Sequence, residues 1–236
     1  MQESKTPLYY GHRERAQEKF LETPNPESIP DYEFLELLLM KSIPRLDVKP
    51  LAKELLKNFG SLSNIFNATF NELSQFKHIK KSTYILFKLI LEANKRLLKE
   101  NLKQRPVLLE RDSLLDYCCL CMGDTTQEKL FALYLDTKGH LIRSETLQTG
   151  TLDQVAIYPR EILKQALLIG AKSLIIVHNH PTGDPRPSSE DYAVTVELYR
   201  VLKTIDIDLI DHLIIGTGHR IFSFREQGHL TVHPKR

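Results

Sequence analysis

Hydrophobic residues in the first hundred positions recur with helical spacing. Residues 32–39 are apolar on nearly every side, which is typical of a helix at the centre of a small bundle. A second helix is predicted over residues 48–59 and ends at Gly60, a residue type that readily adopts the left-handed backbone of a helix C-terminus. A short capped helix ends near Phe76, and a long helix follows over residues 81–102. This half of the chain is therefore predicted to be all-α.

The pattern changes after Pro106, where short apolar runs alternate with helical segments. The runs Leu130–Leu135 and Leu141–Leu147 predict a β-hairpin, because Asp136–Gly139 between them has turn composition. Further strands are expected at residues 174–177, 207–215 and 221–224, with helices at 112–123, 159–170 and 188–203. This order of strands and helices predicts an α/β sandwich. We expect it to occupy residues 105–236, after a helical domain of residues 1–104.

Candidate chemistry is concentrated at the end of one predicted strand. The run Leu174–Val177 has the composition of a buried strand and leads directly into His178 and His180. Side chains two apart in a strand point to the same side, so both imidazoles can face one spot. A helix is then expected to open at Ser188, with Asp191 in its first turn. Two histidines and one carboxylate are a ligand set typical of catalytic zinc, with one coordination position left for water.

Each part of this set also has a simpler interpretation. Ser188 and Asp191 alone would form an ordinary helix capping box. His178 and His180 alone would be hydrogen-bonded core residues. The four residues together favour a metal site.

The spacing His-x-His, seven residues, Ser, two residues, Asp matches the signature of JAMM (MPN+) metallopeptidases, and the chain resembles the RadC family. The resemblance extends through GHRERAQEKF, YPREIL, HNHPTGDPRPSSED and DHLIIG. It implies a JAMM-type α/β sandwich around a mixed sheet, with Zn²⁺ held by His178, His180 and Asp191. It also implies hydrolysis of a peptide or isopeptide bond by metal-activated water, in a peptide or protein substrate that stays unidentified. The family name links the chain to DNA repair.

The same resemblance implies roles for other residues. Glu145 stands where relatives place the catalytic glutamate, which would pass a proton from water to the leaving amine. Ser188 stands at the motif serine, which would help to stabilise the oxyanion. Asp211 and His212 match a family signature in DHLIIG. A hydrogen bond to a ligand histidine and structural pairing between strands are both open roles for them.

The segment Leu73 to Leu89 lies where RadC relatives have a helix-hairpin-helix. That motif binds DNA phosphate through backbone N–H groups of a glycine-bearing hairpin. Here His78 and Lys80 occupy the two glycine positions, so side chains block close approach or demand a costly positive φ. Against this, the segment Lys77 to Arg111 carries ten basic and three acidic residues. Weak, non-specific DNA binding and a solvated face on a helical spacer both stay open.

Composition indicates the class of protein and the cellular location in which this chemistry takes place. Hydrophobic residues make up 42% and charged residues 26% of the chain, as in ordinary globular proteins. No apolar run approaches the ~20 residues needed to span a bilayer, and residues 1–15 lack the apolar core of a signal peptide. We therefore expect a cytoplasmic protein with no membrane partner. The net charge of +5 over residues 1–111 and −3 over residues 112–236 favours two domains with different partners.

The cysteines do not form a disulfide framework, because all three lie within one short segment, at Cys118, Cys119 and Cys121. Cys118 and Cys121 have the spacing of a metal knuckle, but no second pair exists. Reduced, mostly buried thiols on a short helix are expected.

Two alternatives to a zinc peptidase follow from the same residues. One is a DNA-processing repair factor in which the metal domain and the helical module act together on nucleic acid. The other is a binding module with a structural metal, which would need its fourth coordination position closed by the protein. Zinc content, together with activity on peptide and DNA substrates, distinguishes the three.

Overall fold

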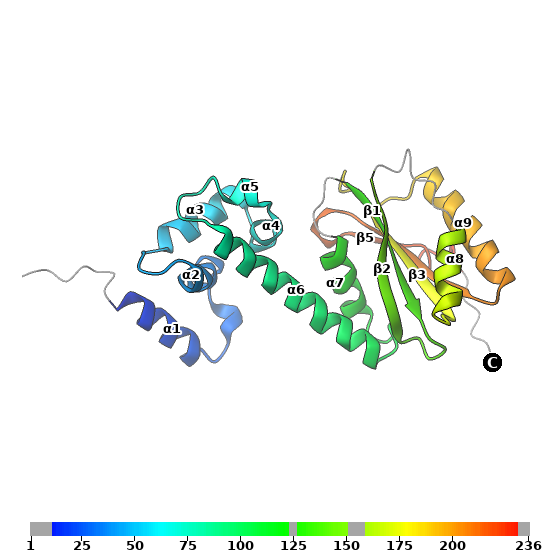
Figure 1. Ribbon diagram of the computed structural model, residues 1–236, viewed down its shortest axis with the longest axis horizontal. Coiled ribbons are helices and arrows are strands. Elements are labelled where there is room, and N and C mark those ends of the chain that lie inside the picture. Colours follow the sequence, from blue (N-terminus) through cyan, green and yellow to red (C-terminus); the bar gives the residue numbers. More distant parts are fainter. Residues whose placement is uncertain (1–10, 123–126, 151–158, 231–236) are drawn as a thin grey trace, which may run out of the picture. The chain divides into compact units, whose positions relative to one another are not determined.

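The computed structural model describes residues 11–122, 127–150 and 159–230 of the 236-residue chain. The predicted helix end at Gly123 lies outside these residues. Most of residues 1–15, which lack the apolar core of a signal peptide, also lie outside them. The chain divides into two compact units, Met1–Glu92 and Ala93–Arg236, and each is described by itself (Figure 1). The division falls within the long helix α6 (Lys81–Gln104). No helix in the described ranges has both the length and the apolar character needed to cross a membrane.

The first unit is built from helices, as the hydrophobic spacing predicted. Before α6 they are α1 (His12–Glu22), α2 (Asp31–Ser42), α3 (Lys49–Phe59), α4 (Leu62–Asn67) and α5 (Phe70–Leu73), with a 3₁₀ turn at Pro26–Ser28. Helix α2 buries Leu35 and Leu39 completely, which makes it part of the core of this unit. Helix α3 ends at Gly60, whose φ of 81° is the left-handed conformation expected there.

Helix α1 is absent from the sequence prediction, and none of its residues is buried. Ala16 packs against the hydrophobic cluster of this unit, and polar contacts hold the helix as well. The guanidinium of Arg13 donates hydrogen bonds to the carbonyl oxygens of Met40, Ile43 and Leu46, at 2.8, 2.5 and 2.8 Å. Hydrogen bonds from one side chain to distant main-chain atoms leave no periodic signal in a sequence.

The segment between α5 and α6 forms a hairpin between two helices. Thr69 and Glu72 make a capping box at the start of α5. The helix ends at Leu73 rather than near Phe76, because the chain turns there and the Phe76 N–H donates to the Leu73 carbonyl. His78, at one of the family's glycine positions, has a φ of 75°. The costly left-handed geometry considered for this position is therefore present.

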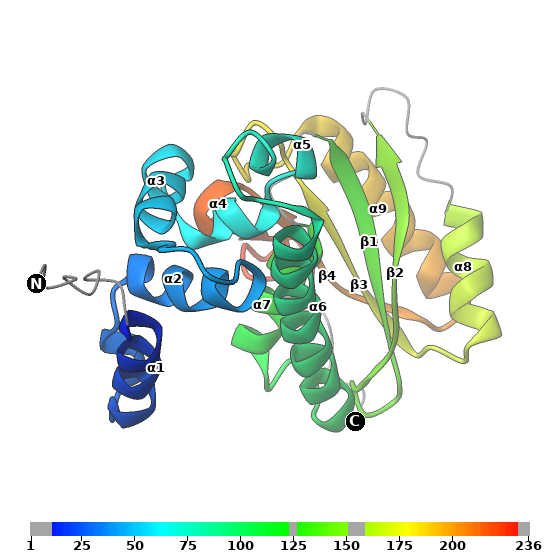
Figure 2. The ribbon, with the colours of Figure 1, turned by 60° about the vertical axis from the view of Figure 1, so that its left-hand side comes forward.

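The second unit contains, in the part of the chain that the structure describes, a five-stranded mixed sheet. Its strands are β1 (Glu128–Leu135), β2 (Leu141–Gly150), β3 (Ser173–Asn179), β4 (Asp208–Ile215) and β5 (Ile221–Ser223). They lie in the order β2-β1-β3-β4-β5, with β3 and β4 parallel and the other neighbours antiparallel. Helix α7 (Arg111–Met122) covers one face, and α8 (Pro159–Leu168) and α9 (Ser189–Thr204) cover the other (Figures 1 and 2). The predicted α/β sandwich around a mixed sheet is confirmed.

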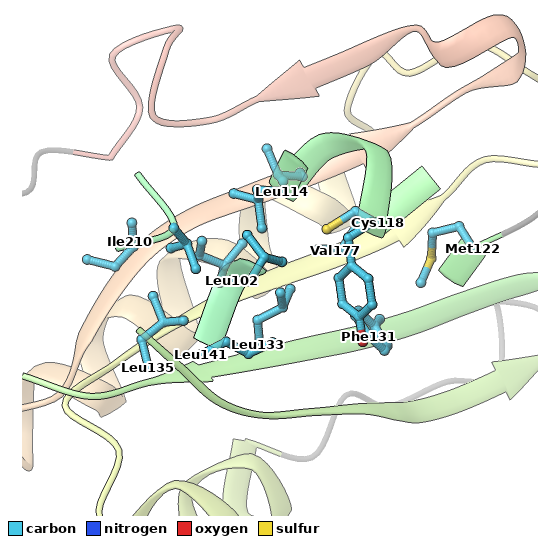
Figure 3. Packing of buried hydrophobic residues seen from close by; sticks show 14 of the residues in the cluster. Leu102, Leu114, Cys118, Met122, Phe131, Leu133, Leu135, Leu141, Val177 and Ile210 are labelled. Atoms are coloured by element: carbon cyan, nitrogen blue, oxygen red, sulfur yellow. The ribbon is translucent and has the colours of Figure 1, made fainter. Parts of the chain in front are cut away.

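Hydrophobic side chains fill the space between α7 and the sheet. Figure 3 shows this cluster, in which Leu114, Cys118 and Met122 of α7 pack with Phe131, Leu133 and Val177 of the strands. Burial raises the pKa of the Cys118 thiol well above its ordinary value, so the thiol stays protonated. Cys119 and Cys121 are partly buried against the same cluster. The three thiols are therefore packing groups on a short helix, as expected.

Candidate metal centre

The three side chains predicted to bind metal converge beyond the end of β3. The Nε2 atom of His178 lies 3.1 Å from Oδ1 of Asp191, and the Nε2 atom of His180 lies 3.4 Å from Oδ2 of the same carboxylate. The two Nε2 atoms are 2.9 Å apart. One nitrogen or oxygen atom from each residue thus lies within 4.8 Å of the others. Strand alternation places both imidazoles on one side, as the spacing predicted.

The other ring nitrogen of each histidine is used away from this point. Nδ1 of His180 lies 2.8 Å from the carbonyl oxygen of Asp184. Because a carbonyl oxygen only accepts, Nδ1 carries the proton, and Nε2 of the neutral ring keeps its lone pair. Nδ1 of His178 lies 2.8 Å from Nε2 of His212. Both histidines therefore present Nε2 to the point where their side chains meet Asp191.

The start of α9 holds Asp191 in place. Ser188 is the N-cap residue, and its Oγ accepts the N–H of Asp191 at 3.1 Å. In return, Oδ2 of Asp191 accepts the Ser188 N–H at 2.7 Å and the Ser188 hydroxyl at 2.8 Å. The capping box is therefore present in addition to the cluster, and it directs the carboxylate toward the histidines.

The charges of the cluster favour a cation at its centre. Burial alone raises the pKa of Asp191, but hydrogen bonds to His178 and His180 and to the main chain of Ser188 outweigh it and hold the pKa well below its usual range. The hydrogen bond to Asp191 in turn raises the pKa of His180, against the effect of burial. A proton on Nε2 satisfies the carboxylate, and a metal ion that replaces the proton satisfies it as well.

Asp211 and His212 face opposite sides of β4 and take different roles. His212 contacts His178 from behind, and burial lowers its pKa well below the ordinary value, so the ring is neutral. The carboxylate of Asp211 instead accepts the Ser223 hydroxyl at 2.6 Å and the Arg225 N–H at 3.0 Å. Of the two roles left open by the sequence, His212 makes the contact with a candidate ligand and Asp211 the pairing between strands.

The loop after His180 is held against the turn that follows β4. Gly183 has a φ of 83°, and a Cβ atom there would lie 2.5 Å from Oγ1 of Thr217. The Gly183 carbonyl accepts the Thr217 N–H at 3.2 Å and the Arg220 guanidinium at 2.7 Å. Glycine is needed for this approach, which positions the neighbouring Asp184 carbonyl that orients His180.

Sequence comparison identifies the domain that carries this cluster. The family model described as RadC-like JAB domain matches residues 108–229. A UPF0758 protein of Ruegeria pomeroyi is 41% identical over 219 residues, which cover 93% of this chain and 97% of the relative. The chain belongs to the RadC-like JAB domain family. A UPF0758 protein of Rhodobacter capsulatus is 42% identical over 211 residues, or 89% of this chain and 98% of that protein.

The family confirms the resemblance inferred from the motifs and places the JAB domain in the JAMM-type hydrolase superfamily. The group of His178, His180 and Asp191, of which the first and last are buried, is able to hold a metal ion, as that superfamily implies.

Glu145 of the JAB domain lies apart from the cluster. It stands in β2 opposite Ala132 of β1, which pairs on its other side with Ile176 of β3. One strand therefore separates Glu145 from β3, and its level in the sheet is two residues before His178. Its Oε2 lies 2.6 Å from the guanidinium of Arg143. The structure thus places Glu145 in a contact with Arg143 rather than among the three converging residues.

A different carboxylate of the JAB domain, that of Glu128, faces the cluster. Leu130 of β1 pairs with His178 of β3. Glu128 lies two residues before Leu130, so it points to the same side of the sheet at the level of His180. After the hydrogen bond to Asp191, the charge of Glu128 is among the causes that raise the pKa of His180. Glu128 is absent from the residues predicted from the sequence, because the predicted strand begins at Leu130.

The side chain of Asn179 holds the end of β1 that carries Glu128. Its Oδ1 accepts the Lys129 N–H at 2.9 Å, and its Nδ2 donates to the Gln127 carbonyl at 3.2 Å. These two hydrogen bonds hold the main chain of the residues immediately before and after Glu128. Asn179, between the two histidines in sequence, is therefore a functional candidate that the motif alone did not reveal.

Proposed function

We propose that this JAB domain is a zinc-dependent hydrolase that cleaves a peptide or isopeptide bond. The observation that carries the proposal is the convergence of two imidazole Nε2 atoms and one carboxylate at His178, His180 and Asp191. This donor set suits zinc. Among the described residues no fourth His, Cys, Asp or Glu joins the group, which supports a catalytic site with an open position over a structural site.

A bound zinc ion would lower the pKa of a water molecule and polarise the substrate carbonyl. The residues of the chain must then move protons. We assign this task to the carboxylate of Glu128, which accepts a proton from the attacking water and returns it to the leaving nitrogen. The strand register favours Glu128 over Glu145, the residue that the family resemblance suggested.

Ser188 has a role in the cap and a proposed role in catalysis. Its hydroxyl hydrogen is directed to Oδ2 of Asp191, so stabilisation of an oxyanion by Ser188 requires that this bond be released when substrate binds. Ser188→Ala separates the two roles. If Ser188 acts as the helix cap, the variant should bind metal more weakly and be less stable. If Ser188 stabilises the oxyanion, the variant should turn over more slowly even when fully loaded with metal.

The first experiment measures zinc content and hydrolysis in the same preparations. We expect about one zinc ion per chain in protein purified without chelators, and loss of that zinc in His178→Ala and His180→Ala. The substrates are internally quenched peptides and peptides branched through a lysine isopeptide bond. A zinc-free wild-type protein, or a zinc-loaded protein that cleaves none of these substrates, would contradict the proposal.

The second experiment compares Glu128→Gln with Glu145→Gln. Both variants should keep zinc, because neither residue belongs to the ligand group. Glu128→Gln should lower turnover by about 10²–10⁴-fold, the usual worth of a positioned acid–base, and Glu145→Gln should retain most of it. The opposite ranking would return the general base to Glu145.

Non-specific DNA binding by the first unit is a second candidate function, favoured by one observation. The hairpin between α5 and α6 exposes Lys77, His78, Lys80 and Lys81 together. If these residues contact phosphates, duplex affinity should fall steeply with salt, and Lys80→Ala with Lys81→Ala should reduce the salt slope by about one per lost contact. Lys57→Ala, at an exposed position on α3, is the matched control. No detectable binding at low salt would leave the unit as a scaffold.

A further inference from the structure

A chain of hydrogen bonds runs behind the metal site, and its direction can be determined from one end. The Thr195 hydroxyl oxygen lies 2.5 Å from the backbone carbonyl oxygen of Asp191, one turn earlier in α9. A carbonyl oxygen only accepts, so the hydroxyl hydrogen points to it. The same hydroxyl oxygen lies 2.6 Å from Nδ1 of His212. Because its hydrogen is already used, the hydroxyl accepts here, and Nδ1 of His212 carries a proton.

The next link follows from the chemistry of a neutral imidazole. His212 is 1% exposed, and its ring stacks on Phe224 with an interplanar angle of 8°. With the proton on Nδ1, its Nε2 is an acceptor. That Nε2 lies 2.8 Å from Nδ1 of His178, so Nδ1 of His178 must be the donor. The Nε2 atom of His178 is then left with a lone pair, at the point where the ligands converge.

The alternative tautomer is the one that Asp191 by itself would select. Oδ1 of Asp191 lies 3.1 Å from Nε2 of His178, and a carboxylate beside a ring nitrogen attracts a proton to it. A proton on that nitrogen would occupy the lone pair that a metal ion needs. His180 avoids this conflict through the Asp184 carbonyl, which accepts its Nδ1–H directly. His178 has a second imidazole in the equivalent place, and an imidazole can donate or accept.

We propose that Thr195 and His212 are positioning residues that hold His178 in its metal-binding tautomer. The Thr195 hydroxyl fixes the proton of His212 on Nδ1. His212 Nε2 then accepts a hydrogen bond from His178, which fixes the proton of His178 on Nδ1. The chain begins at the main chain of Asp191 and ends at His178, so it also ties two ligands from α9 and β3 together through β4. The inference rests on the proposed metal site and goes beyond it, because it assigns function to residues that touch neither metal nor substrate.

The decisive variant is Thr195→Val, which keeps the branched shape and removes the hydroxyl. Without that acceptor, His212 is free to move its proton to Nε2 and donate to His178, whose own proton then moves to Nε2 beside Asp191. Long-range ¹⁵N–¹H spectra of metal-free protein with labelled histidine should show both rings as Nδ1–H tautomers in the wild type and as Nε2–H tautomers in the variant. Thr195→Ser keeps the hydroxyl and should behave as the wild type.

Zinc affinity, measured by competition with a chromophoric chelator, supplies the second readout. Thr195→Val should bind zinc about 10–100-fold more weakly, the usual effect of losing a partner behind a ligand histidine, and Thr195→Ser should restore the affinity. His212→Leu, which removes the acceptor outright, should weaken binding in the same range and serves if Thr195→Val does not fold. Wild-type tautomers and affinity within twofold of wild type in these variants would overturn the inference. A wild-type protein that binds no zinc would instead remove the metal site, and the spectra of the metal-free protein would still decide the relay.

Discussion

Asn179 offers a sharp test of how the second unit assembles its site. The substitution Asn179→Ala removes the amide that bridges the Lys129 N–H and the Gln127 carbonyl. Asn179 is 4% exposed, so the bridge is sheltered from water. Its loss should loosen the end of β1 that carries Glu128, while His178 and His180 keep their own partners on β4 and in the following loop.

The expected cost can be worked out from the two bonds. A neutral hydrogen bond contributes about 1 kcal/mol net to stability, and a buried group left without a partner costs about 1–3 kcal/mol. The Lys129 N–H is only half-buried, so leaving it without a partner should cost about 1–2 kcal/mol, in the lower part of that range. Gln127 is exposed, so its carbonyl finds water and costs little. We therefore expect Asn179→Ala to lower the free energy of unfolding of the second unit by about 1–2 kcal/mol.

Hydrogen exchange measures this change locally, because the Lys129 amide should lose much of its protection. Zinc content should stay at the wild-type level, whereas turnover should fall with the displacement of Glu128. Asn101→Ala, at an exposed helical position, is the matched control and should be nearly neutral. Unchanged protection of Lys129, together with an unfolding free energy within about 0.5 kcal/mol of wild type, would show that the bridge does not hold β1.

Three further predictions concern the surroundings of the site. Gly183→Ala should destabilise the second unit by about 1–3 kcal/mol, because a positive φ and the clash with Thr217 act together; Gly170→Ala, with a positive φ and open space, should cost less in the same urea titration. Burial raises the pKa of Asp211 despite its hydrogen bonds, so the ionised form costs stability. Its contribution to the free energy of unfolding should therefore decline as pH rises from the ordinary carboxyl pKa to the raised one. The Asp211→Asn variant lacks this titration, so the difference between the wild-type and variant stability curves should show that decline. Removal of zinc by a chelator should lower the melting temperature of the wild type, with about 2.7 kcal/mol lost relative to protein at a free zinc concentration of 100 Kd, and should leave that of His180→Ala unchanged.

Much of the fold follows from local sequence patterns. The apolar residues of α2, the C-terminal Gly60 of α3 and the turn before β2 act over a few residues, and the structure has these elements as predicted. Helix α1 could not be predicted in this way, since it is held by Arg13 through main-chain atoms some thirty positions away.

The three candidate metal ligands were determined by the sequence alone. His178 and His180 share a side because strand geometry alternates, and Asp191 turns toward them because a serine three residues earlier caps the helix. Both rules act within a few residues, so a short motif is sufficient to carry them. The identity of these three residues needed no tertiary information.

The groups around these three candidate ligands were decided only by the tertiary structure. The pairing of Leu130 with His178 puts Glu128 rather than Glu145 at the level of the site, and strand register depends on the packing of both faces of the sheet. The path from Thr195 through His212 to His178 joins a helix to two strands. Thr195 and His212 are 17 residues apart in the sequence, and His212 and His178 are 34 residues apart. A hydrogen bond forms wherever packing brings a donor and an acceptor within about 3 Å, and that distance is set by the whole fold rather than by any spacing in the chain.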